Sequence, residues 1–173
     1  MEKRPQWKVA MTYGAMYGLA SSIIYLIFDF SGAAFDNPAP KWIGYLILII
    51  AICMGIVNYR NNEMGGYIKY SRSLGTGVLI GLFGGIVTGI FTVIMFTVID
   101  PELAQKIAEK TQEDMVEKGM SEDQISMAVS WTQKLMHPAL LFIFSILSGA
   151  FMAFIFSLII SVFTKKEQSP FQG

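Results

Sequence analysis

The stretch Ser73–Ile99, SLGTGVLIGLFGGIVTGIFTVIMFTVI, contains no Asp, Glu, Lys, Arg or His. A hydrocarbon core of about 30 Å is crossed by about 20 helical residues, so this stretch can span a bilayer with room to tilt. Three other stretches also lack these residues, except for Asp29 and Lys41 at their ends. Together they predict four membrane spans, at about residues 9–29, 41–59, 73–99 and 138–164.

The composition agrees with a chain that is solvated by lipid. Hydrophobic residues make up 53% of it and charged residues 15%, whereas a soluble domain carries about 25% charged residues. The formal net charge is zero, so no electrostatic footprint for nucleic acid is present. We therefore expect an all-α membrane protein that forms one integral membrane domain over residues 1–173.

Residues 100–137 are the largest polar segment, and they read as two helices. Asp100 is a candidate N-cap for the first helix, and Gly119 is a candidate C-terminal stop. Ser121 and Gln124 have the spacing of a capping box at the start of the second helix. The sequence thus predicts an extramembrane helical hairpin between the third and fourth spans.

The distribution of Lys and Arg predicts the orientation. Eight of them flank the spans on one side: Lys3, Arg4, Lys8, Arg60, Lys69, Arg72, Lys165 and Lys166. The hairpin instead carries eight acids against four lysines. The positive-inside rule places both termini in the cytoplasm and residues 100–137 in the periplasm or outside the cell. The expected location is the cell's inner (plasma) membrane.

Small residues recur at every fourth position in the first, third and fourth spans. In lipid, helices associate largely through close contact along such faces. One interpretation is packing within the bundle, and the other is a docking face for a second subunit. The candidate packing residues are Gly14, Gly18, Gly77, Gly81, Gly85, Gly89, Gly149, Ala153 and Ser157.

A faint internal repeat is also present. Gly14, Gly18 and Asp29 are spaced in the same way as Gly85, Gly89 and Asp100. The first and third spans run in the same direction, so a parallel duplication is one explanation and chance similarity between apolar segments is the other.

Groups that carry chemistry are sparse. The four apolar stretches hold no internal Asp, Glu, Lys, Arg or His, and His137, the only histidine, cannot build a metal site alone. Hydrolase, phosphate-loop and metalloprotease motifs are absent from the sequence. We therefore expect no enzymatic activity, no cofactor and no metal. Arg60, Lys69 and Arg72 are candidate contacts for an anionic lipid headgroup, or else belong to an ordinary basic loop.

Three motifs follow one another in a fixed order: YRNNEMGGYIKY from Tyr59, IDPE from Ile99 and EKGMSEDQI from Glu117. In this order and spacing the chain resembles a bacterial family of small four-span inner-membrane proteins, known only as a domain of unknown function. The resemblance implies a membrane location and the same layout. It transfers no activity, ligand or functional residue.

Good packing surfaces without reactive groups favour a non-enzymatic accessory or scaffold subunit of an envelope complex. Its partners would be membrane lipids and either another membrane protein or further copies of the chain. An oligomeric carrier or channel for small solutes or lipids is the first alternative. An enzyme that acts on membrane lipids is the second, although the chain offers no evident acid, base or metal for it.

Overall fold

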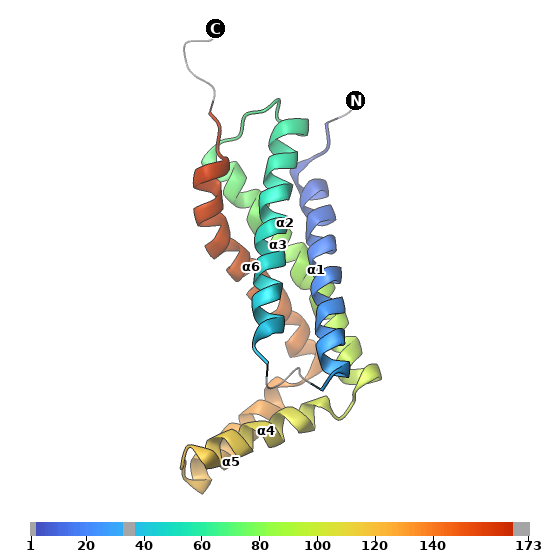
Figure 1. Ribbon diagram of the computed structural model, residues 1–173, viewed down its shortest axis with the longest axis vertical. Helices are drawn as coiled ribbons and strands as arrows, with labels where there is room; N and C mark the ends of the chain where they lie inside the picture. The colour runs from blue at the N-terminus through green and yellow to red at the C-terminus, as the bar shows by residue number, and fades with distance from the viewer. Residues whose placement is uncertain (1–2, 33–36, 168–173) are drawn as a thin grey trace. The chain divides into compact units, whose positions relative to one another are not determined.

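The computed structural model describes residues 3–32 and 37–167. In this part of the chain, six α-helices follow one another (Figure 1): α1 (Gln6–Phe30), α2 (Ala39–Asn58), α3 (Tyr70–Ile94), α4 (Leu103–Glu117), α5 (Glu122–Leu135) and α6 (Pro138–Thr164). Two π-helical segments, η1 (Tyr59–Glu63) and η2 (Met95–Ile99), extend α2 and α3. The predicted all-α fold, with a helical hairpin between the third and fourth long helices, is confirmed.

Four of these helical segments are long and apolar enough to cross a membrane: Gln6–Phe30, Ala39–Glu63, Tyr70–Ile99 and Pro138–Thr164. The helices continue past the apolar stretches by which the sequence defined them, because polar residues extend a helix readily at a membrane surface. The first helix begins three residues before Val9, and the second continues through the polar residues up to Glu63.

The chain divides into two compact units. One, the bundle unit, contains residues 1–88 and 145–173, and the other, the hairpin unit, contains residues 89–144. The bundle unit therefore holds α1, α2, most of α3 and most of α6. The hairpin unit holds the end of α3, η2, α4, α5 and the first turns of α6.

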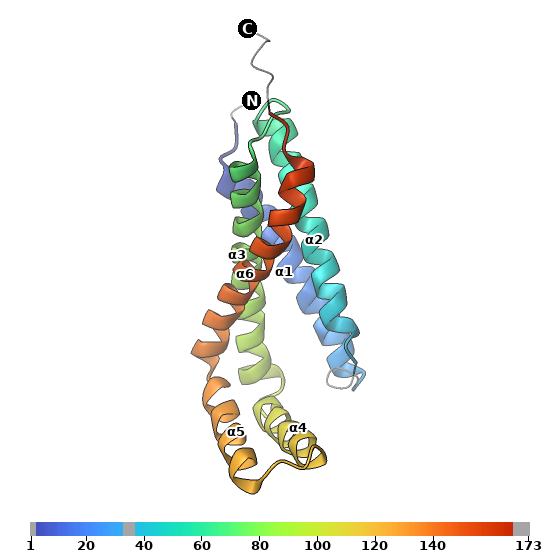
Figure 2. The ribbon, with the colours of Figure 1, turned by 90° about the vertical axis from the view of Figure 1, so that its left-hand side faces the viewer.

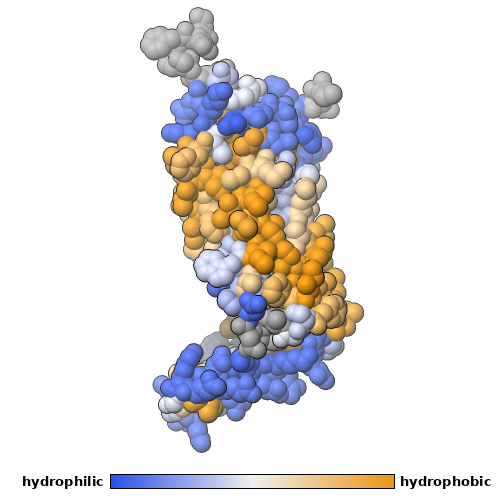
Figure 3. Space-filling model, viewed as in Figure 1, coloured by the Kyte–Doolittle hydropathy of each residue, from blue (hydrophilic) through white to orange (hydrophobic). Residues whose placement is uncertain are grey.

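The bundle unit buries aliphatic side chains together with small and hydroxyl-bearing ones, and it carries many further large apolar side chains on its surface. Its buried core combines a few aliphatic side chains of α2 and α3 with small or polar ones, which include Ala10, Ser22, Ser73, Thr76, Ala153, Ser157 and Ser161. Many other leucine, isoleucine and phenylalanine side chains point outward, and the bundle surface is largely hydrophobic in Figure 3. Water would penalise such a surface, whereas lipid solvates it at no cost.

The bundle unit is closed at one end by contacts between segments that are far apart in the sequence. The first turn of α1 and the last turn of α6 lie at this end (Figure 1). Ile68 and Lys166 exchange two backbone hydrogen bonds, with N···O distances of 2.8 and 3.0 Å. Next to this bridge, the hydroxyls of Ser73 and Thr164 lie 2.8 Å apart in a buried hydrogen bond. The loop before α3 is thereby fixed to the end of α6.

In the hairpin unit, α4 and α5 run side by side in opposite directions (Figure 2). Gly119 has a φ of +69° after the end of α4, and Met120 N donates to Met115 O at 3.1 Å. This is a left-handed helix stop, a conformation that glycine adopts without strain. The predicted stop at Gly119 and the predicted capping box of Ser121 with Gln124 are both confirmed.

The role predicted for Asp100 differs from the observed one. The residue before α4 is Glu102, and no side chain caps this helix. Asp100 Oδ1 instead accepts from Glu102 N at 3.2 Å, and its Oδ2 lies 2.6 Å from Lys106 Nζ. η2 ends at Ile99, so Asp100 shapes the turn between η2 and α4 rather than the first turn of α4 itself.

Candidate functional site

The glycine series of α3 lies against α6. A Cβ placed on Gly85 would lie 2.7 Å from the carbonyl oxygen of Ser145, and one on Gly149 would lie 2.7 Å from that of Gly81. Further along, Gly77 faces the side chain of Ser157, and Gly81 faces Ala153. A gap that excludes even a methyl group means that the two backbones are in direct contact along this face.

The small residues of α1 face α3 from another side. A Cβ on Gly14 would lie 2.6 Å from Ile80 O, and one on Gly18 would lie 2.6 Å from the Cβ of Val87. Helix α3 is therefore the central helix of the bundle unit, in contact with α1 through one face and with α6 through another.

Gly89 belongs to the hairpin unit and faces Phe142 at the start of α6, whose carbonyl oxygen would be 3.2 Å from an added Cβ. All nine candidate packing residues thus contact other helices of the same chain. Their small-residue faces are filled by other helices of the same chain.

The three candidate lipid-binding cations have different surroundings. Arg60 donates through Nη1 to the carbonyl oxygen of Thr164 at 3.0 Å and through Nε to Asn61 Oδ1 at 3.0 Å. Lys69 and Arg72 have exposed side chains. Arg60 therefore helps to join η1 to the end of α6, and Lys69 and Arg72 present their charges to the surroundings.

A buried carboxylate lies at the same end of the bundle unit. Glu63 is 7% exposed and accepts from the backbone N–H of Arg4 at 2.6 Å and from Arg4 Nε at 2.9 Å. The two bonds attach the segment before α1 to the end of η1. This pair could not be predicted from the sequence, because its partners lie far apart in the chain and belong to no motif.

The hairpin unit contains a groove between α4, α5 and the start of α6. The groove has a volume of about 900 Å³. The wall from α4 is formed by Ala104, Gln105, Ala108, Glu109 and Gln112. The opposite wall is formed by Val129, Gln133, Lys134, Met136, His137, Ala139 and Leu140.

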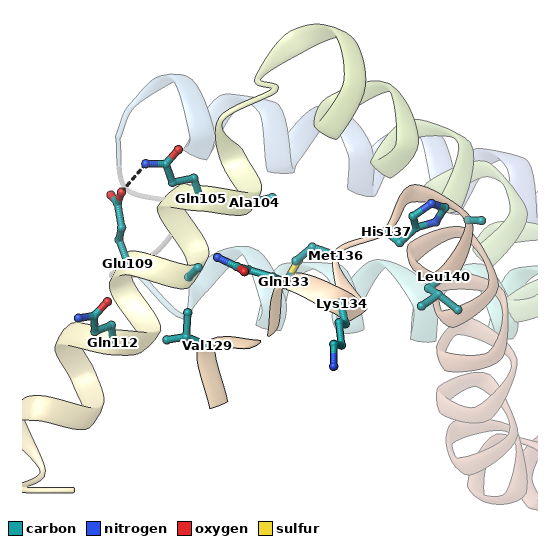
Figure 4. Close-up of a pocket in the computed structure, with 12 residues that line it drawn as sticks. Ala104, Gln105, Glu109, Gln112, Val129, Gln133, Lys134, Met136, His137 and Leu140 are labelled. Atoms are coloured by element: carbon teal, nitrogen blue, oxygen red, sulfur yellow. Dashed lines mark hydrogen bonds between the residues drawn. The ribbon is translucent and has the colours of Figure 1, made fainter. Parts of the chain in front are cut away.

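The groove lining combines apolar side chains with amide and ionisable ones. Figure 4 shows amide side chains on both walls, with Gln105 donating to Glu109 at 2.8 Å. Lys134 and His137 carry the other ionisable groups of the lining. Amide side chains, which have both donors and acceptors, can together with alanine and valine hold a peptide segment through paired hydrogen bonds and apolar contact.

The hollowed surface continues along the hairpin. A second hollow of about 560 Å³ shares Gln112, Val129 and Gln133 with the groove. A third, of about 490 Å³, runs along α4 past Glu109 and Glu117. The sequence could not reveal this surface, since it depends on how α4 packs on α5.

The part of the chain that the structure describes contains no candidate metal site of three or more ligands. No group of three or more His, Cys, Asp or Glu side chains in residues 3–32 and 37–167 has the geometry to hold a metal ion. His137 precedes α6, and its carbonyl oxygen accepts from the backbone N–H groups of Leu140 and Leu141. His137 therefore lies at the start of a helix.

Four long apolar helices with outward-facing leucine, isoleucine and phenylalanine are consistent with a multi-pass α-helical membrane protein. The chain belongs to the family described as protein of unknown function (DUF4199), which it matches over residues 8–166. The match includes all four long apolar helices except the first residues of α1, together with the hairpin, and it confirms the resemblance to an uncharacterised family. No curated protein and no solved structure matches the chain.

Proposed function

We propose that this protein is an accessory subunit of a membrane complex, and that it holds its partner through the hairpin unit. The observation that carries the proposal is the contrast between the two units. The small-residue faces of the bundle unit are filled by helices of the same chain, whereas the hairpin presents an open groove of about 900 Å³.

Charge indicates the chemistry of the partner. All eight acids of residues 100–137 lie in the segment from Asp100 to Asp123, which contains α4. Glu109, Glu113 and Glu117 follow one another along α4, around the groove and the hollow beside it. A basic amphipathic segment of a neighbouring membrane protein would complement this surface, with its apolar side chains against the alanine and valine side chains of the lining.

The structure offers less support for the two alternative functions, a carrier or channel and an enzyme that acts on membrane lipids. Between α3 and α6 the backbones meet at Gly81 and Gly149, which leaves no room for a solute at that level. Chemistry on lipids would require a nucleophile or a general acid that is activated by a neighbouring group. His137 and Glu109 of the groove lining lie on opposite walls, so neither is placed to activate the other.

Photocrosslinking in living cells tests the proposal. A benzophenone amino acid at Gln133, in the groove, should capture a protein whose crosslinked peptide is rich in Lys and Arg. The matched control is Met127, which is exposed on the same helix but outside the groove lining, and it should not give this adduct. Charge reversal by Glu109→Lys and Glu113→Lys should reduce the yield from Gln133 severalfold.

Adducts from Gln133 to copies of the chain alone, or adducts unaffected by the charge reversal, would contradict the proposal. A purified homo-oligomer that passes solutes across a liposome membrane would favour the carrier instead.

A further inference from the structure

A second surface of the hairpin unit is apolar and lies away from the groove. Met127, Trp131 and Leu135 recur every four residues on α5, so they share one face of it. Their side chains are 64%, 59% and 42% exposed. At about 100° per residue, Trp131 lies about 200° around the helix from Val129, which lines the groove. The helix thus has an inner face towards α4 and an unpartnered outer face.

The charges of α5 are arranged so that this outer face can approach lipid. Between Gln124 and His137 the chain contains no acid, and Lys134 is the only lysine or arginine. Lys134 Nζ lies 5.5 Å from the centroid of the Trp131 ring, at the edge of the outer face. A tryptophan beside a lysine on an amphipathic helix is typical of the boundary between headgroups and acyl chains.

Chain continuity places the same end of α5 next to a membrane-spanning segment. Helix α5 ends at Leu135, and α6 begins at Pro138. Three residues reach at most about 11 Å, and Trp131 is one helical turn, about 6 Å, further along α5. Within the hairpin unit, α6 exposes Ile143 and Phe144 soon after it begins. The outer face of α5 is therefore within reach of the surface of the bilayer that α6 enters.

We propose that the outer face of α5, formed by Met127, Trp131 and Leu135, rests in the lipid interface on the side of the membrane that carries the hairpin. The occupant of this face is the bilayer itself. Contact with lipid would orient α5 and leave the acidic side of α4 and the groove towards the aqueous phase. Since one lysine is the only basic group on this part of α5, the contact should not require anionic lipid.

Fluorescence of the full chain in nanodiscs tests the assignment. The chain has three tryptophans, so W7F and W42F leave Trp131 as the only emitter. Phosphatidylcholine with bromine high on its acyl chains should quench most of the Trp131 emission, and bromine near the bilayer centre should quench less. The matched control is W131F with E113W, because Glu113 is exposed and lies on α4, along the hollow outside the main groove. Its emission should be nearly unchanged.

Each result decides the matter. Quenching of Trp131 no greater than that of the control, whether both are weak or both are strong, overturns the assignment. A blue-shifted but unquenched Trp131 also overturns it, because a protein surface would then cover the face. If the tryptophan variants fail to fold, a nitroxide at position 131, in the C53S background, replaces the emitter. Greater collision with oxygen than with a water-soluble nickel reagent supports the lipid contact, and the reverse contradicts it.

Discussion

At the scale of single residues, the missing Cβ of glycine and a few buried polar groups determine how the helices meet. Backbone contact between Gly81 and Gly149 allows van der Waals attraction along the whole face, and without water this is a main source of helix association. The nine small residues were recognisable in the sequence by their spacing. Which helix each of them contacts was not, because a four-residue spacing identifies a face but not its partner.

Gly81→Leu should strongly destabilise the bundle. The new side chain would collide with Ala153 and with the carbonyl of Gly149, and overpacking of this kind costs roughly 1–3 kcal/mol. Thermal unfolding in detergent measures the effect. Gly44→Leu is the matched control, since a Cβ at Gly44 meets no atom within 4 Å. Equal melting temperatures for the two variants would refute a packing role for Gly81.

The two hydrogen bonds between Arg4 and Glu63 predict that substitution of Glu63 disturbs the start of α1 more than substitution of Arg4. Glu63→Ala removes the acceptor for both bonds from Arg4, whereas Arg4→Ala removes only the side-chain donor and keeps the backbone N–H. Hydrogen exchange at the start of α1 should therefore accelerate more in Glu63→Ala than in Arg4→Ala. The opposite order would show that the guanidinium, and not the backbone bond, attaches this segment.

At the scale of elements, the absence of charge was enough to predict four long helices, and turn residues were enough to predict the hairpin. Gly119 and Ser121 act locally, so their roles could be recognised without the fold. Asp100 could not be assigned correctly, because its carboxylate binds Lys106, and that contact depends on the path of the chain after η2. The groove was beyond prediction for a similar reason: Gln105, Gln112 and Gln133 form no motif.

Ser121→Ala should loosen the start of α5. Loss of a helix N-cap costs about 1 kcal/mol, and here the side chain accepts from Gln124 N at 3.4 Å. Hydrogen exchange in the full chain should accelerate in the first turn of α5 and remain unchanged in α3. Ser126→Ala is the control, because Ser126 lies in the middle of α5 with an exposed side chain and does not cap the helix. A similar acceleration in both variants would argue against the capping box as a stabilising feature.

The loop before α3 predicts a lipid preference. Lys69 and Arg72 are exposed beside Tyr67 and Tyr70, and a cation near an anionic membrane surface contributes about 1 kcal/mol. Lys69→Gln with Arg72→Gln should lower the amount of anionic lipid that copurifies with the chain. Lys110→Gln with Lys118→Gln, on the hairpin, is the control and should leave that amount unchanged. If both double variants lose the same amount, the headgroup contact does not lie at this loop.

At the scale of the whole molecule, the outward-facing apolar side chains and the four long helices are consistent with a multi-pass membrane protein. The central claim is that these helices cross the bilayer four times, with the basic loop and the acidic hairpin on opposite sides. We expect this orientation from the positions of Lys and Arg, because positively charged loops tend to be retained in the cytoplasm.

Labelling of single cysteines in intact cells, or in spheroplasts if an outer membrane blocks access, tests that claim most directly. In a Cys53→Ala background, Ser126→Cys reports on the hairpin and Ser71→Cys on the basic loop, and both positions are exposed. A membrane-impermeant maleimide should label Ser126→Cys at once and Ser71→Cys only after the membrane is permeabilised. Labelling of both positions before permeabilisation, of neither, or of Ser71→Cys alone would contradict this arrangement.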